Sequence, residues 1–259
     1  MKTLVLDVGN THTVAGVYDG LVATALLAQA RYRTDSQATA DEYRMGLSQL
    51  FSEKLPFPLW DPRQGGVSRV IVSTVVPQLE RVISQACPVV HFVRASSPRK
   101  FELDLPVPES LGADRLANVA GALCLTQGPL LIVDAGTATT FCLVDSRPAY
   151  VGGAIVPGLE TSWKALQSRA ARLYSVELSR PESTVGRTTE TQIQSGVIQG
   201  YEALIEGMTD RLLRDAGPEF ARATLFATGG CIQMLKLSPR FRVEADLTLR
   251  GLLRYGELL

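Results

Sequence analysis

Hydrophobic and polar positions follow one another along the chain in a pattern that predicts mixed α/β structure. Apolar runs at 3–8, 13–18 and 22–29 predict three strands near the start. The stretches RVIVSTVV and VVHFV predict two more strands in the first half. In the second half, apolar residues at helical spacing predict one long helix over about 190–215. Strands and helices mixed in this way are typical of layered α/β proteins.

Turn and capping residues place the remaining elements. Thr39 and Glu42 fit a capping box, so a helix should begin near Thr39, and another should follow Pro77 to about Ala86. The segment 95–111 is rich in proline, serine and charge and has the composition of a connection. After it, ADRLANVAGALCL predicts an apolar helix, residues 149–155 a strand, and ATLFATGGC a strand that ends in two glycines.

The opening stretch LVLDVGNTHTVAGVYDG has a counterpart, LIVDAGTATTFCLVDS, about half a chain later. Both consist of an apolar strand, Asp-x-Gly-[Asn/Thr], a few small polar residues, a second apolar strand and another aspartate. A repeat at this period predicts two similar domains in tandem. We place them at residues 1–110 and 111–259.

The two predicted turns carry more polar groups than a hairpin needs. Asn10, Thr11 and Thr137 add amide, hydroxyl and backbone donors, and Asp7 and Asp134 stand where the strands end. A carboxylate at such a place can order a metal-bound water around phosphates. Two such turns facing each other would hold an anion with several oxygens, bridged by Mg²⁺. The alternative is a pair of hairpins whose aspartates only cap their own turns.

Composition and the absence of other motifs narrow the choice. The 259 residues include 26 basic and 26 acidic ones, and this zero balance speaks against a nucleic-acid partner. Two histidines and four cysteines without a C-x-x-C pair argue against a zinc site. No G-x-G, Walker A or G-x-S-x-G motif occurs. The uncharged stretch Leu116–Val133 is divided by Gly128-Pro129, so we expect a helix, a turn and a strand there and no membrane segment. Without a signal-peptide pattern at the N-terminus, the cytoplasm is the expected location.

Paired D-x-G turns also occur in aspartic proteases, where two carboxylates share a proton. Those turns have threonine or serine between the aspartate and the glycine, whereas this chain has Val8 and Ala135. The later TGG would have no role in such an enzyme. We therefore favour phosphate binding.

Several stretches together carry a family resemblance: DVGNTHT, LGADRLAN, DAGTATT, GGAIVPGL, TETQIQSGVIQGY and ATGG, in this order over nearly the whole chain. The sequence resembles the type III pantothenate kinases of the actin, sugar-kinase and heat-shock-ATPase superfamily. The resemblance implies an α/β fold of two duplicated ribonuclease-H-like domains with ATP in the cleft between them. It also implies transfer of the γ-phosphoryl group of ATP to the primary hydroxyl of pantothenate, the first step towards coenzyme A.

The resemblance further implies roles for matching positions. Pantothenate would contact Thr189 and the GADR stretch, in which Asp114 would be the general base. Asp134 would bind a monovalent cation, K⁺ or NH₄⁺, alongside the Mg²⁺ that accompanies ATP. The family also implies a homodimer. The expected pantothenate contacts in GADR are Gly112, Ala113, Asp114 and Arg115. The expected ATP contacts are Asp7, Val8, Gly9, Asn10, Thr11, His12, Thr13, Val14 and Thr137.

Two positions depart from the family pattern, and two other functions stay open. Many members carry asparagine where this chain has Thr188, and an aromatic residue near the place of Leu105. Asp114 and Arg115 could also belong to a capped helix with a surface salt bridge, although a carboxylate there suits a hydroxyl acceptor. The open alternatives are a non-catalytic regulator on the same fold and a kinase of another small hydroxyl compound.

Overall fold

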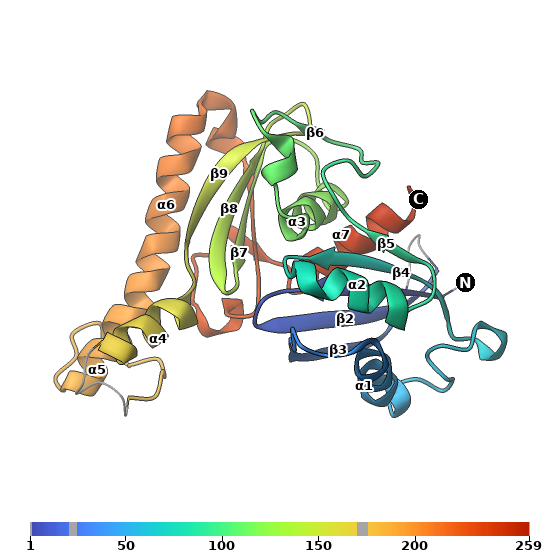
Figure 1. Ribbon diagram of the computed structural model, residues 1–259. Coiled ribbons are helices and arrows are strands. Elements are labelled where there is room, and N and C mark those ends of the chain that lie inside the picture. Colours follow the sequence, from blue (N-terminus) through green and yellow to red (C-terminus); the bar gives the residue numbers. More distant parts are fainter. Residues whose placement is uncertain (1, 21–24, 170–175, 259) are drawn as a thin grey trace. The chain divides into compact units, whose positions relative to one another are not determined.

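The computed structural model describes residues 2–20, 25–169 and 176–258, which form two compact units with one mixed sheet each (Figure 1). The first unit comprises Met1–Glu102, Pro106–Leu125 and Asp246–Leu259, and the second comprises Leu103–Leu105 and Thr126–Ala245. These units are not divided at residue 110. Two helices that lie beyond that point in the sequence, α3 (Ala113–Leu123) and α7 (Leu247–Gly256), belong to the first unit because they pack against each other and against its strands.

The first unit has the strand order β3-β2-β1-β4-β5, in which β1 is antiparallel to β2 and parallel to β4. Its strands are β1 (Lys2–Val8), β2 (His12–Asp19), β3 (Leu26–Arg33), β4 (Val67–Thr74) and β5 (Val90–Phe92). Its helices are α1 (Ala40–Ser52), α2 (Pro77–Ala86), α3 (Ala113–Leu123) and α7 (Leu247–Gly256), with short 3₁₀ turns η1 (Pro62–Gln64) and η2 (Pro108–Ser110).

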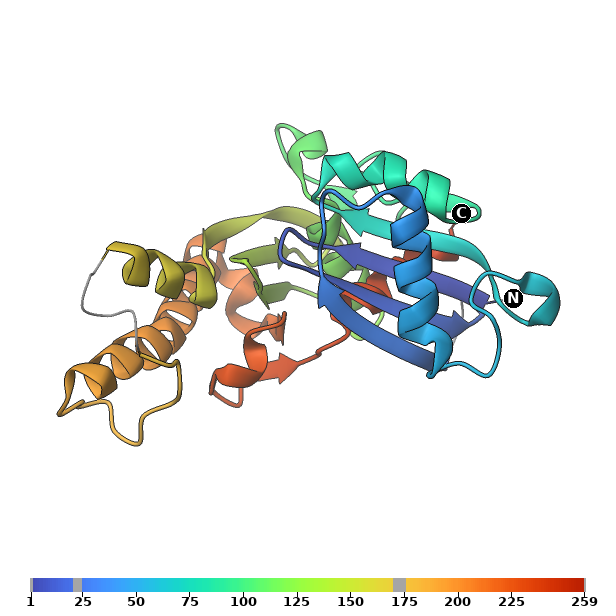
Figure 2. The ribbon, with the colours of Figure 1, turned by 60° about the horizontal axis from the view of Figure 1, so that its bottom comes forward.

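Helices cover both faces of this sheet. Leu4, Leu6 and Val8 of β1 form one core with residues of α1 and α2, and Figure 2 shows α1 lying across the strands. The other face receives α7, whose Leu249 lies beside Gly16, the strand neighbour of Val5. The predicted capping box of α1 is confirmed, because the side chains and backbones of Thr39 and Glu42 bond each other reciprocally.

The third strand lies later than predicted. The described part of the expected strand 22–29 begins at residue 25, and β3 runs from Leu26 to Arg33. Residues 22–24 lie outside the described residues. Ala28 and Ala30 are buried while the residues between and beside them are exposed. The bounds of this strand therefore follow from its pairing with β2 and from the alternation of buried and exposed residues. They do not follow from the apolar run that predicted it.

The second unit has the strand order β11-β10-β7-β8-β9-β6. Its core joins Leu131, Val133 and Ala135 to Tyr201 and Ile205 of α6, which runs beside the sheet in Figure 1. Its strands are β6 (Glu102–Leu103), β7 (Leu130–Ala135), β8 (Ala138–Val144), β9 (Ala149–Pro157), β10 (Thr224–Thr228) and β11 (Phe241–Val243). Its helices are α4 (Leu159–Arg169), α5 (Thr189–Gln194), the π-helix η3 (Ser195–Gln199), α6 (Gly200–Ala216), η4 (Pro218–Arg222) and η5 (Ile232–Met234).

The two sheets confirm the internal repeat. Replacing β1, β2, β3, β4 and β5 by β7, β8, β9, β10 and β11 turns one strand order into the other, and β6 is an added edge strand. The pairing directions agree, because β7 is antiparallel to β8 and parallel to β10. The long helix predicted over 190–215 is confirmed as the continuous run α5, η3 and α6.

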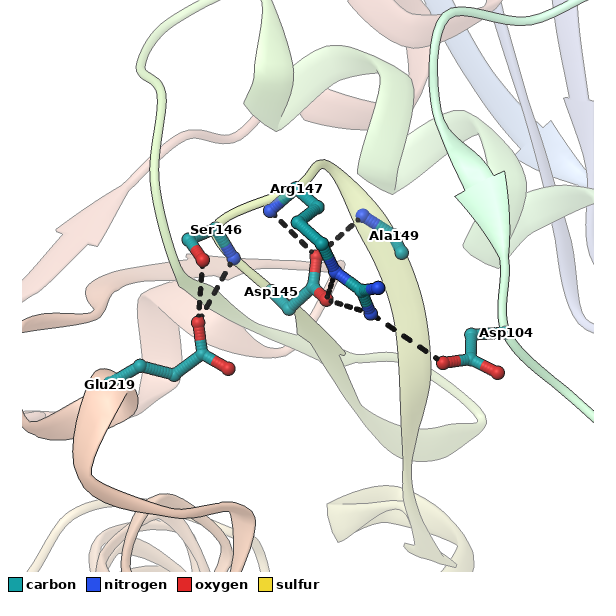
Figure 3. Close-up of polar contacts among 6 residues, drawn as sticks. All are labelled: Asp104, Asp145, Ser146, Arg147, Ala149 and Glu219. Carbon is teal, nitrogen blue, oxygen red and sulfur yellow. Dashed lines mark hydrogen bonds and ion pairs between the residues drawn. The ribbon is translucent and has the colours of Figure 1, made fainter.

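A buried carboxylate closes the connection from β8 to β9 (Figure 3). Asp145 accepts hydrogen bonds from the backbone N–H groups of Arg147 and Ala149, both at 2.9 Å, and from the Arg147 guanidinium at 2.8 Å. Burial works to raise the pKa of Asp145, but these hydrogen bonds together outweigh it and leave the pKa below its usual value. Arg147 also reaches Asp104 at 3.8 Å, and Ser146 donates to Glu219 at 2.7 Å.

The uncharged stretch from Leu116 has the predicted form. Helix α3 ends at Leu123, Gly128 turns the chain with a φ of +95°, and β7 begins at Leu130. In the described part of the chain, no helix combines the length and apolarity needed to cross a membrane.

Candidate active site

The first polar turn joins β1 to β2. Val8 pairs with Thr13, so residues 9–12 make the turn, and the N–H of Gly9 donates to the carbonyl of His12 at 3.1 Å. Asp7 stands half-buried one residue before the strand ends. The expected ATP contacts from Asp7 to Val14 are therefore brought together in one hairpin.

Thr34 holds this turn from the end of β3. Its hydroxyl donates to the carbonyl of Gly9 at 2.7 Å and lies 2.9 Å from the hydroxyl of Thr13. Its backbone N–H donates to the carbonyl of Thr11 at 3.0 Å. Sequence reasoning missed Thr34, because its place depends on where β3 pairs with β2.

The side chains of the turn are not equally available to a ligand. Val8 and Thr13 are buried, so their side chains are not available to a ligand. Asn10 is exposed, while Thr11 and His12 are half-buried. The ring of His12 lies 3.3 Å from the guanidinium of Arg31 on the neighbouring strand. The turn thus offers backbone groups, an amide and a hydroxyl, as phosphate binding requires.

The second polar turn joins β7 to β8 and is one residue shorter. Ala135 pairs with Thr139, and the N–H of Gly136 donates to the carbonyl of Ala138 at 3.1 Å. Thr137 is exposed at its tip. Two donors from the start of α4 hold the Thr137 carbonyl: the N–H of Gly158 at 3.0 Å and the hydroxyl of Thr161 at 2.6 Å.

The ATGG stretch covers Asp134, which sequence reasoning did not foresee. Strand β10 lies parallel to β7, with Thr228 directly beside Asp134. The next residue, Gly229, has a φ of +99°, and a Cβ there would overlap Oδ1 of Asp134 and lie 2.5 Å from the nitrogen of Ala135. Only glycine fits a position that combines this backbone angle with so close an approach. The signal was present in the sequence as a strand that runs into a glycine pair.

The GADR stretch begins helix α3. Gly112 is the N-cap and supplies no capping side chain, and Asp114 turns one carboxylate oxygen back to accept from the N–H of Arg115 at 2.8 Å. A Cβ on Gly112 would lie 2.5 Å from that oxygen, so glycine makes room for the carboxylate. Asp114 and Arg115 are both half-buried, whereas Ala113 is buried. One oxygen of Asp114 is fixed, and this fixes the direction of the other.

Thr189 is the first residue of α5 and is exposed. Its neighbour Thr188 caps the helix, because its hydroxyl accepts from the N–H of Thr191 at 3.2 Å. Threonine and asparagine are both good N-cap residues, so Thr188 can cap α5 although it departs from the family pattern.

The donor set can be tested against the expected cations. Among the described residues, no group of three histidine, cysteine or acidic side chains is placed to hold a metal ion. A cation at Asp7 or Asp134 would therefore take its other ligands from backbone, water or phosphate oxygens. Mg²⁺ is bound in this way in phosphoryl-transfer enzymes, through one or two carboxylates with waters and substrate oxygens. The residues present fit that arrangement.

Comparisons with known proteins bear on these features. Residues 3–211 match the family model described as type III pantothenate kinase. The type III pantothenate kinase of Exiguobacterium sibiricum is 38% identical over 96% of both chains, and that of Thermus thermophilus is 39% identical over 97% of both. The solved activator of 2-hydroxyisocaproyl-CoA dehydratase from Clostridium difficile superposes with a TM-score of 0.54 at 12% identity, covering 100% of this chain and 96% of the other. This last likeness concerns the fold alone, and it agrees with the expected α/β fold of two duplicated domains.

Proposed function

Since the chain belongs to the type III pantothenate kinase family, we propose that its two polar turns hold the phosphates of ATP and that Asp114 accepts the proton of the pantothenate hydroxyl. The chain is a kinase that phosphorylates pantothenate with ATP in coenzyme A biosynthesis. One observation supports the role of Asp114 most directly: its carboxylate is half-buried at the start of α3, and one of its oxygens is held by a hydrogen bond from the N–H of Arg115.

The first turn is proposed to bind phosphate oxygens through its backbone N–H groups, Asn10 and Thr11. Thr137 adds the corresponding group of the second turn. Thr34, Gly158 and Thr161 hold the carbonyls of these turns by the bonds described above, which leaves the turns rigid before ATP binds. Rigid donors lose little freedom on binding and stabilise charge that develops on the phosphates.

The acceptor is proposed to bind at the start of α3. Arg115 can form a forked pair with the carboxylate of pantothenate, and Gly112, Ala113 and Thr189 contribute further contacts. In the transfer step the bond from the γ-phosphorus to the bridging oxygen of ADP breaks, and a bond from that phosphorus to the acceptor oxygen forms. The proton of the acceptor hydroxyl passes to the free carboxylate oxygen of Asp114.

Two cations complete the proposal. Asp7 would hold Mg²⁺ through ordered water molecules, and the cation would supply positive charge that offsets the phosphates of ATP. Asp134 would bind K⁺ or NH₄⁺, with backbone oxygens nearby as further ligands. Gly229 keeps room beside Oδ1 of Asp134 that a side chain would fill, which supports a role for this oxygen.

We further propose a homodimer in the cytoplasm, whose chain arose by duplication of one domain. These points rest on the family and on the repeat. Light scattering tests the dimer: a mass of 28.0 kDa, that of a single chain, at working concentration would contradict it.

Asp114→Asn tests the catalytic assignment. Asparagine keeps the size of the side chain and still accepts a hydrogen bond, but it does not take up a proton. Turnover should fall ~10²–10⁴-fold, which corresponds to roughly 3–5 kcal/mol of barrier. The affinity for ATP should change little, since its contacts lie in the two turns. The measurement is a coupled assay with ATP and pantothenate, next to a calorimetric titration with nucleotide.

Glu109→Gln is the matched control, because this exposed acid lies five residues before Asp114 in the same segment. It should behave like the wild type. Near wild-type turnover of Asp114→Asn would remove Asp114 as the base. If the wild-type protein binds ATP but phosphorylates only a different small alcohol, or none, one of the two alternative functions takes over.

A further inference from the structure

Two buried hydroxyl groups occupy equivalent places in the two units. Ser73 on β4 lies directly beside Asp7 on β1, and Thr228 on β10 lies directly beside Asp134 on β7. Strands β4 and β10 correspond to each other in the repeat, as do β1 and β7. The same pair, a hydroxyl beside the aspartate of the polar turn, thus occurs once in each unit.

Both hydroxyls lack a hydrogen-bond partner among the described residues. Ser73 is fully buried and Thr228 is 1% exposed, and the oxygen of each side chain is inaccessible to solvent. A buried polar group without a partner costs about 1–3 kcal/mol. Such groups are rare in folded proteins and are often explained by function. Alanine or valine would avoid this cost after the apolar runs VIV of β4 and LFA of β10.

Strand geometry directs each hydroxyl to its aspartate. Residues that are partners in adjacent parallel strands project from the same face of the sheet, and the strands are ~4.8 Å apart. A hydroxyl and a carboxylate at this separation can join directly after a rotation of one side chain, or through one water molecule. The hydroxyl can donate, and an ionised carboxylate can only accept.

Other buried hydroxyls in the same condition lie elsewhere and serve as a comparison. Thr3 lies on β1 itself, four residues before Asp7, and its partners in the sheet are Tyr18 and Arg69. Thr209 lies on α6. Neither is paired with an acid in a strand, so both serve as controls for the loss of a buried hydroxyl away from the aspartates of the turns.

We propose that Ser73 and Thr228 are positioning residues. In the nucleotide-bound enzyme each donates a hydrogen bond, directly or through one water, that fixes the orientation of Asp7 or Asp134. This proposal rests on the proposed function, in which these aspartates act on the phosphates and their cations. In the nucleotide-free protein each buried hydroxyl lowers stability, and nucleotide binding supplies the hydrogen bond that it lacks.

The test compares Ser73→Ala and Thr228→Val with the controls Thr3→Val and Thr209→Val. Each substitution removes one buried hydroxyl, but only the first two remove it beside an aspartate. The probe is Mg²⁺·ADP in potassium buffer, measured by calorimetry, together with turnover and the melting temperature of the nucleotide-free protein. Ser73→Ala and Thr228→Val should weaken Mg²⁺·ADP binding or slow turnover by about 10–100-fold, without a fall in the melting temperature. The controls should change none of these, and Ser73→Thr and Thr228→Ser should restore wild-type values.

Two results would overturn the inference. One is that Ser73→Ala and Thr228→Val bind Mg²⁺·ADP and turn over like the controls. The other is that they only melt at a lower temperature, which is the behaviour of hydroxyls that stabilise the fold. Failure of the proposed function is recognised separately, because Asp7→Asn would then bind Mg²⁺·ADP and turn over like the wild type, and the inference would fall with it.

Discussion

The two units share one strand order, but they support their polar turns by different means. The first turn is held by Thr34 at the end of the next strand. The second is held by Gly158 and Thr161, which belong to the connection into α4. The repeat has thus kept the turn and its aspartate, while the residues that hold the turn have been replaced. This difference indicates that the position of the turn backbone matters more than how it is held.

Two equivalent threonines show the same difference inside the units. Thr13 and Thr139 both pair with the residue that follows the aspartate, and both are buried. The hydroxyl of Thr13 bonds that of Thr34, whereas the hydroxyl of Thr139 bonds Tyr201 of α6 at 2.7 Å. Tyr201 also donates to the carbonyl of Pro157 at 2.8 Å, so α6 is tied to the strand that leads to Gly158. The long helix of the second unit therefore supports the second polar turn through Tyr201.

The far ends of the two hairpins differ in burial. Asp19 is the last residue of β2, and Asp145 directly follows β8. The N–H of Asp19 donates to the carbonyl of Ala25 at 3.2 Å, and the N–H of Asp145 donates to the carbonyl of Ala149 at 2.9 Å. Asp19 is exposed, while only 5% of the Asp145 side chain is exposed. Equivalent acids thus have a solvated place in one unit and a hydrogen-bonded, buried place in the other.

The largest expected effect separates the two aspartates of the turns. Asp7→Asn should lower turnover by about 10²-fold or more, because an amide lacks the charge that orders the hydrated Mg²⁺. Asp134→Asn should instead raise the concentration of K⁺ or NH₄⁺ needed for activity. The measurement is turnover at saturating ATP and Mg²⁺ over a series of K⁺ concentrations, with sodium as the comparison.

The same series also shows how this prediction could fail. Unchanged turnover of Asp7→Asn would remove Asp7 from phosphate binding. Equal wild-type rates in sodium and potassium would count against a cation at Asp134. If Asp7→Asn and Asp134→Asn change the K⁺ dependence of turnover in the same way, the two aspartates have the same role and the proposed difference between the turns is wrong.

A second prediction concerns Gly229, whose close approach to Asp134 has no equivalent described in the first turn. Gly229→Ala should destabilise the protein by about 1–3 kcal/mol beyond the cost of the backbone angle, because the new Cβ overlaps Asp134 and Ala135. Gly128→Ala is the control, since Gly128 has a similar φ of +95° and nothing within 4 Å of the added Cβ. Urea unfolding of both variants measures the difference. Equal losses would show that the backbone angle alone requires glycine at 229.

The smallest effect concerns Asp145 and depends on pH. The pKa of this buried carboxylate is below its usual value, so its charge stabilises the fold above the unfolded pKa of about 4. This contribution should be lost as the pH falls below about 4 towards the folded pKa. Asp145→Asn should lower stability by about 1–3 kcal/mol at neutral pH and flatten the dependence of stability on pH in this acid range.

Asp19→Asn is the matched control for this acid range, since Asp19 holds the equivalent position in the first unit but is exposed. Its melting curve should stay close to that of the wild type between pH 3 and 7. A steep acid loss that persists in Asp145→Asn would assign the pH dependence to other carboxylates, such as Glu206, whose pKa is also lowered: burial opposes the shift, but hydrogen bonds from Ser238 and Arg240 outweigh it.

Features set by neighbours in the sequence were predictable from it. The capping box of Thr39 and Glu42, the two polar turns and the long helix after Thr188 each depend on residues a few positions apart, and the structure has all of them. The repeat could also be read from the sequence, because both copies kept the same alternation of apolar and polar positions. The GADR stretch was found through its family resemblance, and its helix start was readable from Gly112 and the apolar run after it.

Only the tertiary structure decided which distant residues meet. Pairing of β1 with β4 places Ser73 beside Asp7, and pairing of β7 with β10 places Gly229 on the carboxylate of Asp134. Because β3 extends later in the sequence than predicted, Thr34 lies where it bonds the first turn. Helix α7 belongs to the first unit although its residues follow those of the second unit in the sequence. A sequence pattern fixes which face of a strand is buried. The partner of that strand and the register between them depend on packing and hydrogen bonds between segments that can be more than a hundred residues apart.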